Sequence, residues 1–107
     1  MPKYLYQASY SADGLKGLQK DGASGREAAA KAAIKSVGGK LDAMYFSFGK
    51  ADVVCIIDMP DNATAAGMSA VISSSGLVHG VLTPLMTPKE LDKGLAKKAK
   101  YRAPGTK

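Results

Sequence analysis

Few side chains in this 107-residue sequence suggest chemistry, and they lie far apart along the chain. The single histidine, His79, could act as an acid–base group or as an axial ligand of haem iron, although one histidine more commonly has an ordinary surface role. Asp52 lies beside a turn, where its carboxylate could accept a proton or, more commonly, cap the turn. Arg26 lies at the start of a predicted helix and could bind an anion there, or simply be solvated. His79 has no second metal-type ligand near it in sequence, so no metal site is predicted.

Tyrosines form a second group of candidates, this time for ligand binding. A tyrosine ring is flat and apolar and ends in a hydroxyl, so it suits the wall of a small-molecule cavity. If these rings faced helices instead, they would be ordinary core residues. The candidates are Tyr4, Tyr6, Tyr10 and Tyr45. No phosphate-binding loop, CxxC pair, HExxH motif or nucleophile elbow occurs in the sequence.

Length and composition predict one ordinary globular domain. The chain is 46% hydrophobic and 22% charged, values that disfavour disorder, a fibrous repeat or a disulfide framework. No apolar run approaches the roughly 18 residues needed to span a bilayer, and the N-terminal residues lack the pattern of a secretory signal. We therefore expect a cytoplasmic protein with no membrane partner. The only cysteine, Cys55, lies in the most apolar run and is predicted to be a buried, unreactive thiol.

Positive charge is concentrated at the C-terminal end of the chain. Residues 89–107 contain seven basic and two acidic residues, whereas residues 1–88 contain eight basic and seven acidic residues. This difference predicts a nearly neutral domain over residues 1–88 and a basic C-terminal helix and tail over residues 89–107. Tyr101 is the only aromatic residue among the tail's charges, which disfavours a nucleic-acid partner. The tail favours solubility or a loose electrostatic tether, with docking on an acidic partner as a weaker idea.

Periodicity and capping signals predict an ordered series of strands and helices. Residues 3–10 alternate cleanly, so Tyr4, Tyr6 and Tyr10 should share one face of a strand. Predicted strands cover residues 3–10, 40–48, 52–59 and 77–86, and predicted helices cover residues 24–37, 62–73 and, more briefly, 89–100. The glycine-rich residues 11–25 predict a loop with at most one helical turn.

The sequence of the first predicted helix, residues 24–37, supports two further predictions. Ser24 and Glu27 have the S-x-x-E spacing of a capping box, which predicts that the helix begins there. Its apolar stripe is made of small residues, so the helix is expected to lie close to whatever it packs on. The predicted stripe is Ala30, Ala33, Ile34 and Val37.

The element order predicts an α+β, ferredoxin-like βαββαβ fold: an antiparallel sheet with both helices on one face, followed by a C-terminal helix. Pro84 places the last strand at an edge of the sheet. The register of the central hairpin stays open, with Phe46 and Phe48 beside either Val53 and Cys55 or, with a longer loop, Val54 and Ile56.

The strand over residues 52–59 predicts self-association. It is expected to be central, and every position from Val53 to Ile57 is apolar, so both of its faces need covering. Leaving Val54 and Ile56 in water would forgo about 3–6 kcal/mol, a large share of a stability of about 5–15 kcal/mol. We therefore expect a homo-oligomer, a dimer or larger, in which the uncovered sheet face packs against a second copy.

Three segments resemble those of small bacterial GYD-domain proteins, and the likeness covers roughly residues 1–88. They are MPKYLYQASYSADGLKGL, GREAAAKAAIKSVGGKL and YFSFGKADVVCIIDMPDNATAA. The Gly-Tyr-Asp signature of the family is matched at Gly49 and Asp52, whereas Ala51 replaces the tyrosine, so any role of that tyrosine is lost. The resemblance implies a ferredoxin-like domain related to the dimeric α/β-barrel superfamily, and it implies no assigned activity or cofactor.

Two classes of function follow from these observations. The first is a non-catalytic homo-oligomeric module that binds a small, partly aromatic molecule between sheets, with the four tyrosines as its walls. The alternative is a cofactor-free or haem-using oxygenase-type enzyme of the dimeric α/β-barrel kind, with His79 and Asp52 as acid–base groups. Few titratable residues are available for a proton relay, which favours the binding module.

Overall fold

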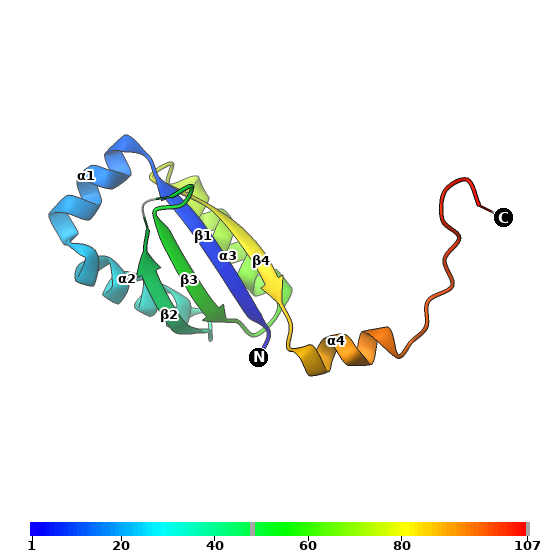
Figure 1. Cartoon of the computed structure of the whole chain (residues 1–107). Helices are drawn as coiled ribbons and strands as arrows, with labels where there is room; N and C mark the ends of the chain where they lie inside the picture. The colour runs from blue at the N-terminus through cyan, green and yellow to red at the C-terminus, as the bar shows by residue number, and fades with distance from the viewer. Residues whose placement is uncertain (48, 107) are drawn as a thin grey trace.

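A four-stranded antiparallel sheet organises the computed structural model, which describes residues 1–47 and 49–106 (Figure 1). In chain order the elements are β1 (Lys3–Tyr10), α1 (Ala12–Asp21), α2 (Ala23–Ser36), β2 (Lys40–Phe46), β3 (Val53–Asp58), α3 (Asn62–Ser74), β4 (Val78–Leu85) and α4 (Pro88–Leu95). The strand order is β2-β3-β1-β4, with β3 inside and β4 at an edge, as predicted. Figure 1 shows α2 and α3 behind the sheet. The α+β, ferredoxin-like prediction is confirmed.

The alternation of β1 and β3 separates a core face from an outer face. On β1 the side chains of Tyr4, Tyr6 and Ala8 are buried, and on β3 those of Val53, Cys55 and Ile57 are buried. The residues between them point to the opposite side of the sheet. We call the side that carries the buried residues the helix face and the other side the outer face.

The hairpin between β2 and β3 agrees with the first of the two predicted registers only in placing Phe46 beside Val53, because Cys55 lies opposite Met44. Tyr45 lies opposite Val54, with an irregularity at Asp42 between Leu41 and Ala43. Such a bulge shifts the facing of the strand locally. Phe48, which the prediction placed at the end of this strand, lies outside the described residues.

The predicted loop over residues 11–25 is wrong, because α1 is a full helix of 10 residues. The side chain of Ser11 caps it by accepting a hydrogen bond from the Gly14 amide at 3.0 Å. Gly14 is buried, and a Cβ at this position would clash with the backbone oxygen of Leu77. A tertiary contact that requires glycine therefore explains why a helix tolerates this glycine-rich sequence.

The predicted start and packing of α2 are also wrong. Gly22, with φ of 77°, ends α1 and is at once the N-cap of α2, so the helix begins at Ala23 and has no side-chain cap. The Ser24 and Glu27 capping box therefore does not form. Of the predicted stripe only Ile34 is buried, and Val37 is 39% exposed. Because α2 packs mainly on β2 and α3 mainly on β4, the two helices leave a gap above the central strands.

The C-terminal segment leaves the domain instead of folding back on it. α4 begins with a complete capping box between Thr87 and Glu90 and ends at Leu95, earlier than predicted. Figure 1 shows α4 and the following residues projecting away from the sheet. Leu91 and Leu95 are 48% and 67% exposed, and within the described residues α4 makes at most marginal contact with the rest of the chain.

None of the helices in the described part of the chain combines the length and the apolar character that crossing a bilayer requires.

Candidate functional site

The two candidate acid–base residues lie in one row of the sheet but not in contact. His79 on β4 is opposite Ser9 on β1. On the other side of Ser9 lies Asp52, the residue just before β3, because the neighbouring pair in the β1–β3 register is Ala8 and Val53. Two strand spacings separate His79 from Asp52, which corresponds to about 10 Å. His79 is exposed, and the Asp52 carboxylate accepts a 2.8 Å hydrogen bond from the Tyr10 amide. Asp52 therefore joins the start of β3 to the end of β1.

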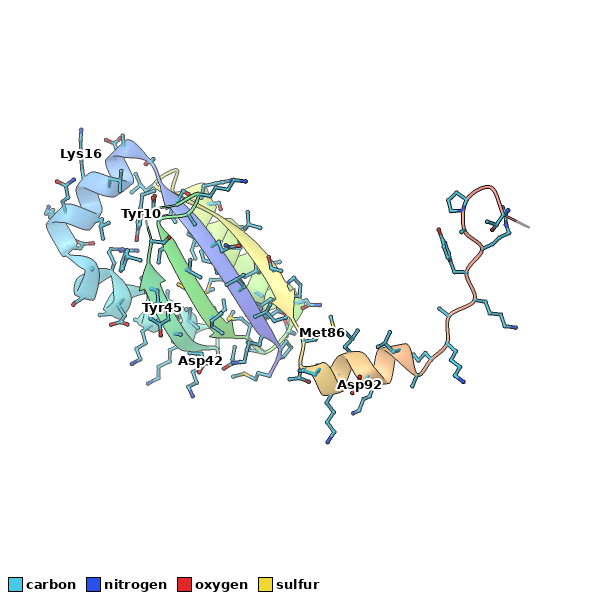
Figure 2. The ribbon with its side chains drawn as sticks, viewed as in Figure 1. Tyr10, Lys16, Asp42, Tyr45, Met86 and Asp92 are labelled. Atoms are coloured by element: carbon cyan, nitrogen blue, oxygen red, sulfur yellow. The ribbon has the colours of Figure 1, made fainter. Side chains whose placement is uncertain are left out.

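The four tyrosines are divided between the two faces of the sheet. Tyr4, Tyr6 and Tyr10 belong to the helix face, whereas Tyr45 is on β2 and 70% exposed (Figure 2). Tyr4 is 2% exposed and its hydroxyl donates a hydrogen bond to the Asn62 side chain at the start of α3. A single chamber between two sheets would need all four on the outer face. Tyr4 thus has a core role here, and Tyr6 and Tyr10 line a different space.

That space is an apolar cavity of about 120 Å³ between the sheet and the two helices. Its floor includes Ala8, Val53 and Cys55 from the central strands. Its roof includes Ala30 of α2 and Met68 of α3, which lie on either side of the gap between the helices. Small alanine side chains on α2 do not reach across that gap, so the space stays open.

Arg26 lies where this cavity meets a second hollow. A neighbouring space of about 340 Å³ shares Tyr10 and Arg26 with the first and extends beneath α1. The Arg26 side chain is 33% exposed, and its guanidinium lies 3.6 Å from the Asp21 carboxylate, which lines the second hollow. Among the described residues that line the first cavity, Arg26 alone carries a charge.

The Tyr6 hydroxyl is a buried polar group without a hydrogen-bond partner among the described residues. Burial raises the pKa of Tyr6 and the nearby Cys55 sulfur adds to the rise, while Ser69 on α3 opposes it. Among the described residues no hydrogen bond of normal geometry joins Tyr6 to Ser69, so the hydroxyl is unsatisfied. The ring packs over Gly80 of β4, where a Cβ would overlap it.

Cys55 forms part of the cavity floor as a neutral thiol. Its side chain is 6% exposed, and burial raises its pKa from 9.0 to about 11. The predicted buried position is therefore confirmed. Around neutral pH the sulfur is protonated and a weak nucleophile, which suits a structural role in the wall.

Groups that could hold a metal are not found in the described part of the chain, where no cluster of three or more His, Cys, Asp or Glu side chains occurs. Sequence reasoning did not identify the cavity walls contributed by Met68 and Ala30. The run of alanines in α2 was the available signal, because small side chains at a helix–sheet contact can leave space as well as permit close packing.

The outer face has an apolar centre between two polar ends. Its centre consists of Leu5, Val54 and Ile56, which are half-buried, and Tyr45 and Val81, which are 70% and 62% exposed. We call these five residues the outer patch. The exposed Gln7 lies on the same face between Val54 and Val81, so the apolar connection from Val81 to the rest of the patch runs through Leu5.

One polar end of the outer face is an ion-pair cluster. The Lys3 ammonium lies 2.9 Å from both the Asp42 and Asp58 carboxylates. Hydrogen bonds to Asp42 and then Asp58 raise the pKa of Lys3, and Lys3 in turn lowers the pKa of Asp42. The other end is the row of Ser9, Asp52 and His79 described above.

Comparison with known proteins gives one match. The sequence model of the GYD domain matches residues 4–95, which is most of the chain. The chain therefore belongs to the GYD domain family. No curated protein and no solved structure matches it. The family assignment agrees with the resemblance of the three sequence segments and supplies no reaction or ligand.

Proposed function

We propose that this GYD-domain protein is a homodimeric binding module, in which the outer faces of two sheets pack together and each subunit retains a small-molecule cavity under its helices. The observation that carries the proposal is the outer patch. It places apolar side chains of all four strands on a face that no helix of the described chain covers (Figure 1). Isolated apolar residues on a surface are ordinary, but a contiguous patch across a sheet favours an interface.

The arrangement of charges supports a second copy as the occupant of this face. The apolar centre is bordered by the Lys3 cluster at one end and by Ser9, Asp52 and His79 at the other. Interfaces commonly have this anatomy, with an apolar core inside a polar rim. A two-fold arrangement would bring each centre against the same centre of its partner, which makes the patch self-complementary.

The sheet face alone is smaller than a standard dimer interface. Strands of six to eight residues and the three spacings between four strands give a face of about 23 Å by about 14 Å, or about 330 Å² in projection. A standard interface buries about 800 Å² on each partner. We therefore infer that the arm, defined as residues 86–95, adds to the contact, because α4 projects beyond the sheet (Figure 1) and Met86, Leu91 and Leu95 are exposed.

Matched valine substitutions test this assembly. Val81 on the outer face and Val71 on α3 are 62% and 71% exposed, so lysine is tolerated at both positions in a lone subunit. Light scattering coupled to size exclusion should give a dimer for the wild type and for Val71→Lys. Val81→Lys should raise the dimer dissociation constant at least about tenfold, because an unpaired charge would be buried in the interface. A monomeric wild type, or dissociation by Val71→Lys instead, would refute the proposed pairing.

The oxygenase alternative has no comparable support from geometry. His79 and Asp52 are about two strand spacings apart, and the Asp52 carboxylate is engaged by the Tyr10 amide. Haem titration nevertheless distinguishes the two functions directly. A visible absorption band that appears with haem and disappears in His79→Ala would favour the enzyme, whereas the binding module predicts no band that depends on His79.

A further inference from the structure

We infer that the helix-face cavity binds a small aromatic or similarly compact apolar molecule that carries one negative charge, with the apolar part in the cavity and the anionic group at Arg26. This inference deepens the proposed function, because it assigns the ligand class of the binding module. It depends on the cavity within one subunit and not on the sheet interface. The two can therefore fail separately.

Size and polarity of the cavity define the apolar part of the ligand. An apolar cavity of about 150 Å³ is known to accept benzene. The cavity here is about 120 Å³ and adjoins the second hollow at Arg26, so a single ring would fill it and a substituent would extend past Arg26. Most of the described side chains that line the cavity are aliphatic, among them Ala8, Val53 and Ile57 on its sheet side. Highly polar ligands such as sugars would lose hydrogen bonds with water and regain few here.

Charge at the opening defines the other end of the ligand. Arg26 is the charged residue among the described lining residues, and the Asp21 carboxylate lies on the far side of it, in the second hollow. Their separation of 3.6 Å is long for a charge-assisted hydrogen bond. A carboxylate on the ligand could therefore bind the guanidinium at normal distance. A cationic ligand would be repelled by Arg26 at the same place.

Paired probes and paired variants test the ligand class on the full-length protein. Benzoate and benzamide have nearly the same shape and differ in charge. In wild type, titration followed by amide chemical shifts should show benzoate binding about tenfold more tightly than benzamide, because the charged partner strengthens the hydrogen bond to Arg26. Arg26→Gln should remove this preference, and Arg26→Lys should keep part of it. Asp21→Asn should strengthen benzoate binding, since Asp21 competes for the guanidinium.

Substitutions on α2 test the location. Ala30 lines the cavity, whereas its neighbour Ala29 is exposed and does not line it. Ala30→Leu should fill the cavity and weaken benzoate binding at least about tenfold, while Ala29→Leu, with the same change of side chain, should leave it unchanged. Circular dichroism checks that both variants fold.

Each outcome has a distinct meaning. Equal binding of benzoate and benzamide, or benzoate binding that survives Ala30→Leu, would overturn this inference while the binding module stands. Failure of both probes to bind would overturn the inference and the binding role together. A monomer that binds benzoate with the predicted preference would overturn the dimer alone and support the inference.

Discussion

The carboxylate of Asp52 accepts a 2.8 Å hydrogen bond from the backbone amide of Tyr10, and the Asp52 amide donates to the Ala8 carbonyl at 2.8 Å. Through these two bonds Asp52 extends the β1–β3 pairing by one residue before Val53, the first residue of β3. Tyr10 is thereby held at the junction of the two hollows beside Arg26. Asp52, an acid–base candidate in the sequence, thus positions part of the wall of the helix-face cavity.

Removing that carboxylate should destabilise the fold. Asp52→Ala leaves the part-buried Tyr10 amide without its acceptor, and we expect the free energy of unfolding to fall by about 1–3 kcal/mol. Asp52→Asn keeps an oxygen acceptor and should lose less. Urea denaturation provides the measurement, and Asp13→Ala on the exposed surface of α1 is the control. A change in Asp52→Ala no larger than in the control would contradict this role.

Gly80 should not tolerate a side chain, because the Tyr6 ring occupies the space that a Cβ would need. Gly80→Ala is expected to displace that ring and destabilise the protein by about 1–3 kcal/mol. Gly67→Ala is the matched control, since Gly67 lies within α3 and a Cβ there meets no atom within 4 Å. The control should gain up to about 1 kcal/mol of stability from helix propensity. Thermal denaturation of both variants decides the matter, and equal effects would be inconsistent with the Tyr6 packing.

The Cys55 thiol should react slowly in the folded protein. With a pKa of about 11 and 6% exposure, it is almost entirely protonated at pH 8 and sterically shielded. Labelling of the folded protein with a chromogenic disulfide should be more than about a hundredfold slower than labelling of the protein unfolded in guanidinium chloride. This ratio follows from the difference in thiolate fraction alone. Comparable rates in the folded and unfolded protein would show that the cavity floor is open to solvent.

The same thiol predicts how stability depends on pH at the alkaline end. Its pKa is raised on folding from 9.0 to about 11, so the folded state favours the protonated form. The contribution of the protonated thiol to the free energy of unfolding is therefore complete below pH 9 and is lost as the pH rises toward 11. Cys55→Ala should flatten this part of a curve of unfolding free energy against pH. An unchanged slope in that variant would assign the alkaline loss to other groups.

The arm is expected to contribute to assembly and not to the stability of the subunit. Leu91 and Leu95 are one helical turn apart and exposed, and an isolated helix of this length is marginal in water. Leu91→Ala combined with Leu95→Ala should weaken the dimer several-fold while changing the unfolding of a lone subunit little. Lys89→Ala and Lys93→Ala together serve as the control on the same helix. If the leucine substitutions leave the dimer unaffected, the arm has no place in the interface.

Local patterns in the sequence predicted the sheet well, since its strands carry their own signals. Alternation in β1 placed Tyr4, Tyr6 and Tyr10 on one face, and the helix predicted over residues 62–73 forms as α3, capped by Asp61, whose side chain accepts a hydrogen bond from the Thr64 amide at 2.7 Å. Pro84 correctly placed β4 at an edge. These features depend on neighbours close in sequence, which is why residue type and spacing were sufficient.

The parts that were missed depend on contacts between distant segments. α1 forms despite its glycines because Gly14 packs against the backbone at Leu77. The Ser24 and Glu27 spacing suggested a cap, but α1 ends so close to it that Gly22 takes the N-cap position of α2. Likewise the cavity results from where two helices lie over the sheet, and no local pattern specifies that separation.

Contact between the outer faces of two copies is the central claim, and isotope-filtered nuclear Overhauser spectra test it most directly. In a mixture of labelled and unlabelled protein, methyl groups of Val54 and Ile56 should show intermolecular contacts with the same region of the second copy. Methyl groups of Ile72, which lines the helix-face cavity, should show none. Intermolecular contacts at α2 or α3 with none at Val54 and Ile56 would contradict the contact between outer faces. A protein that is monomeric at every concentration tested would contradict it as well.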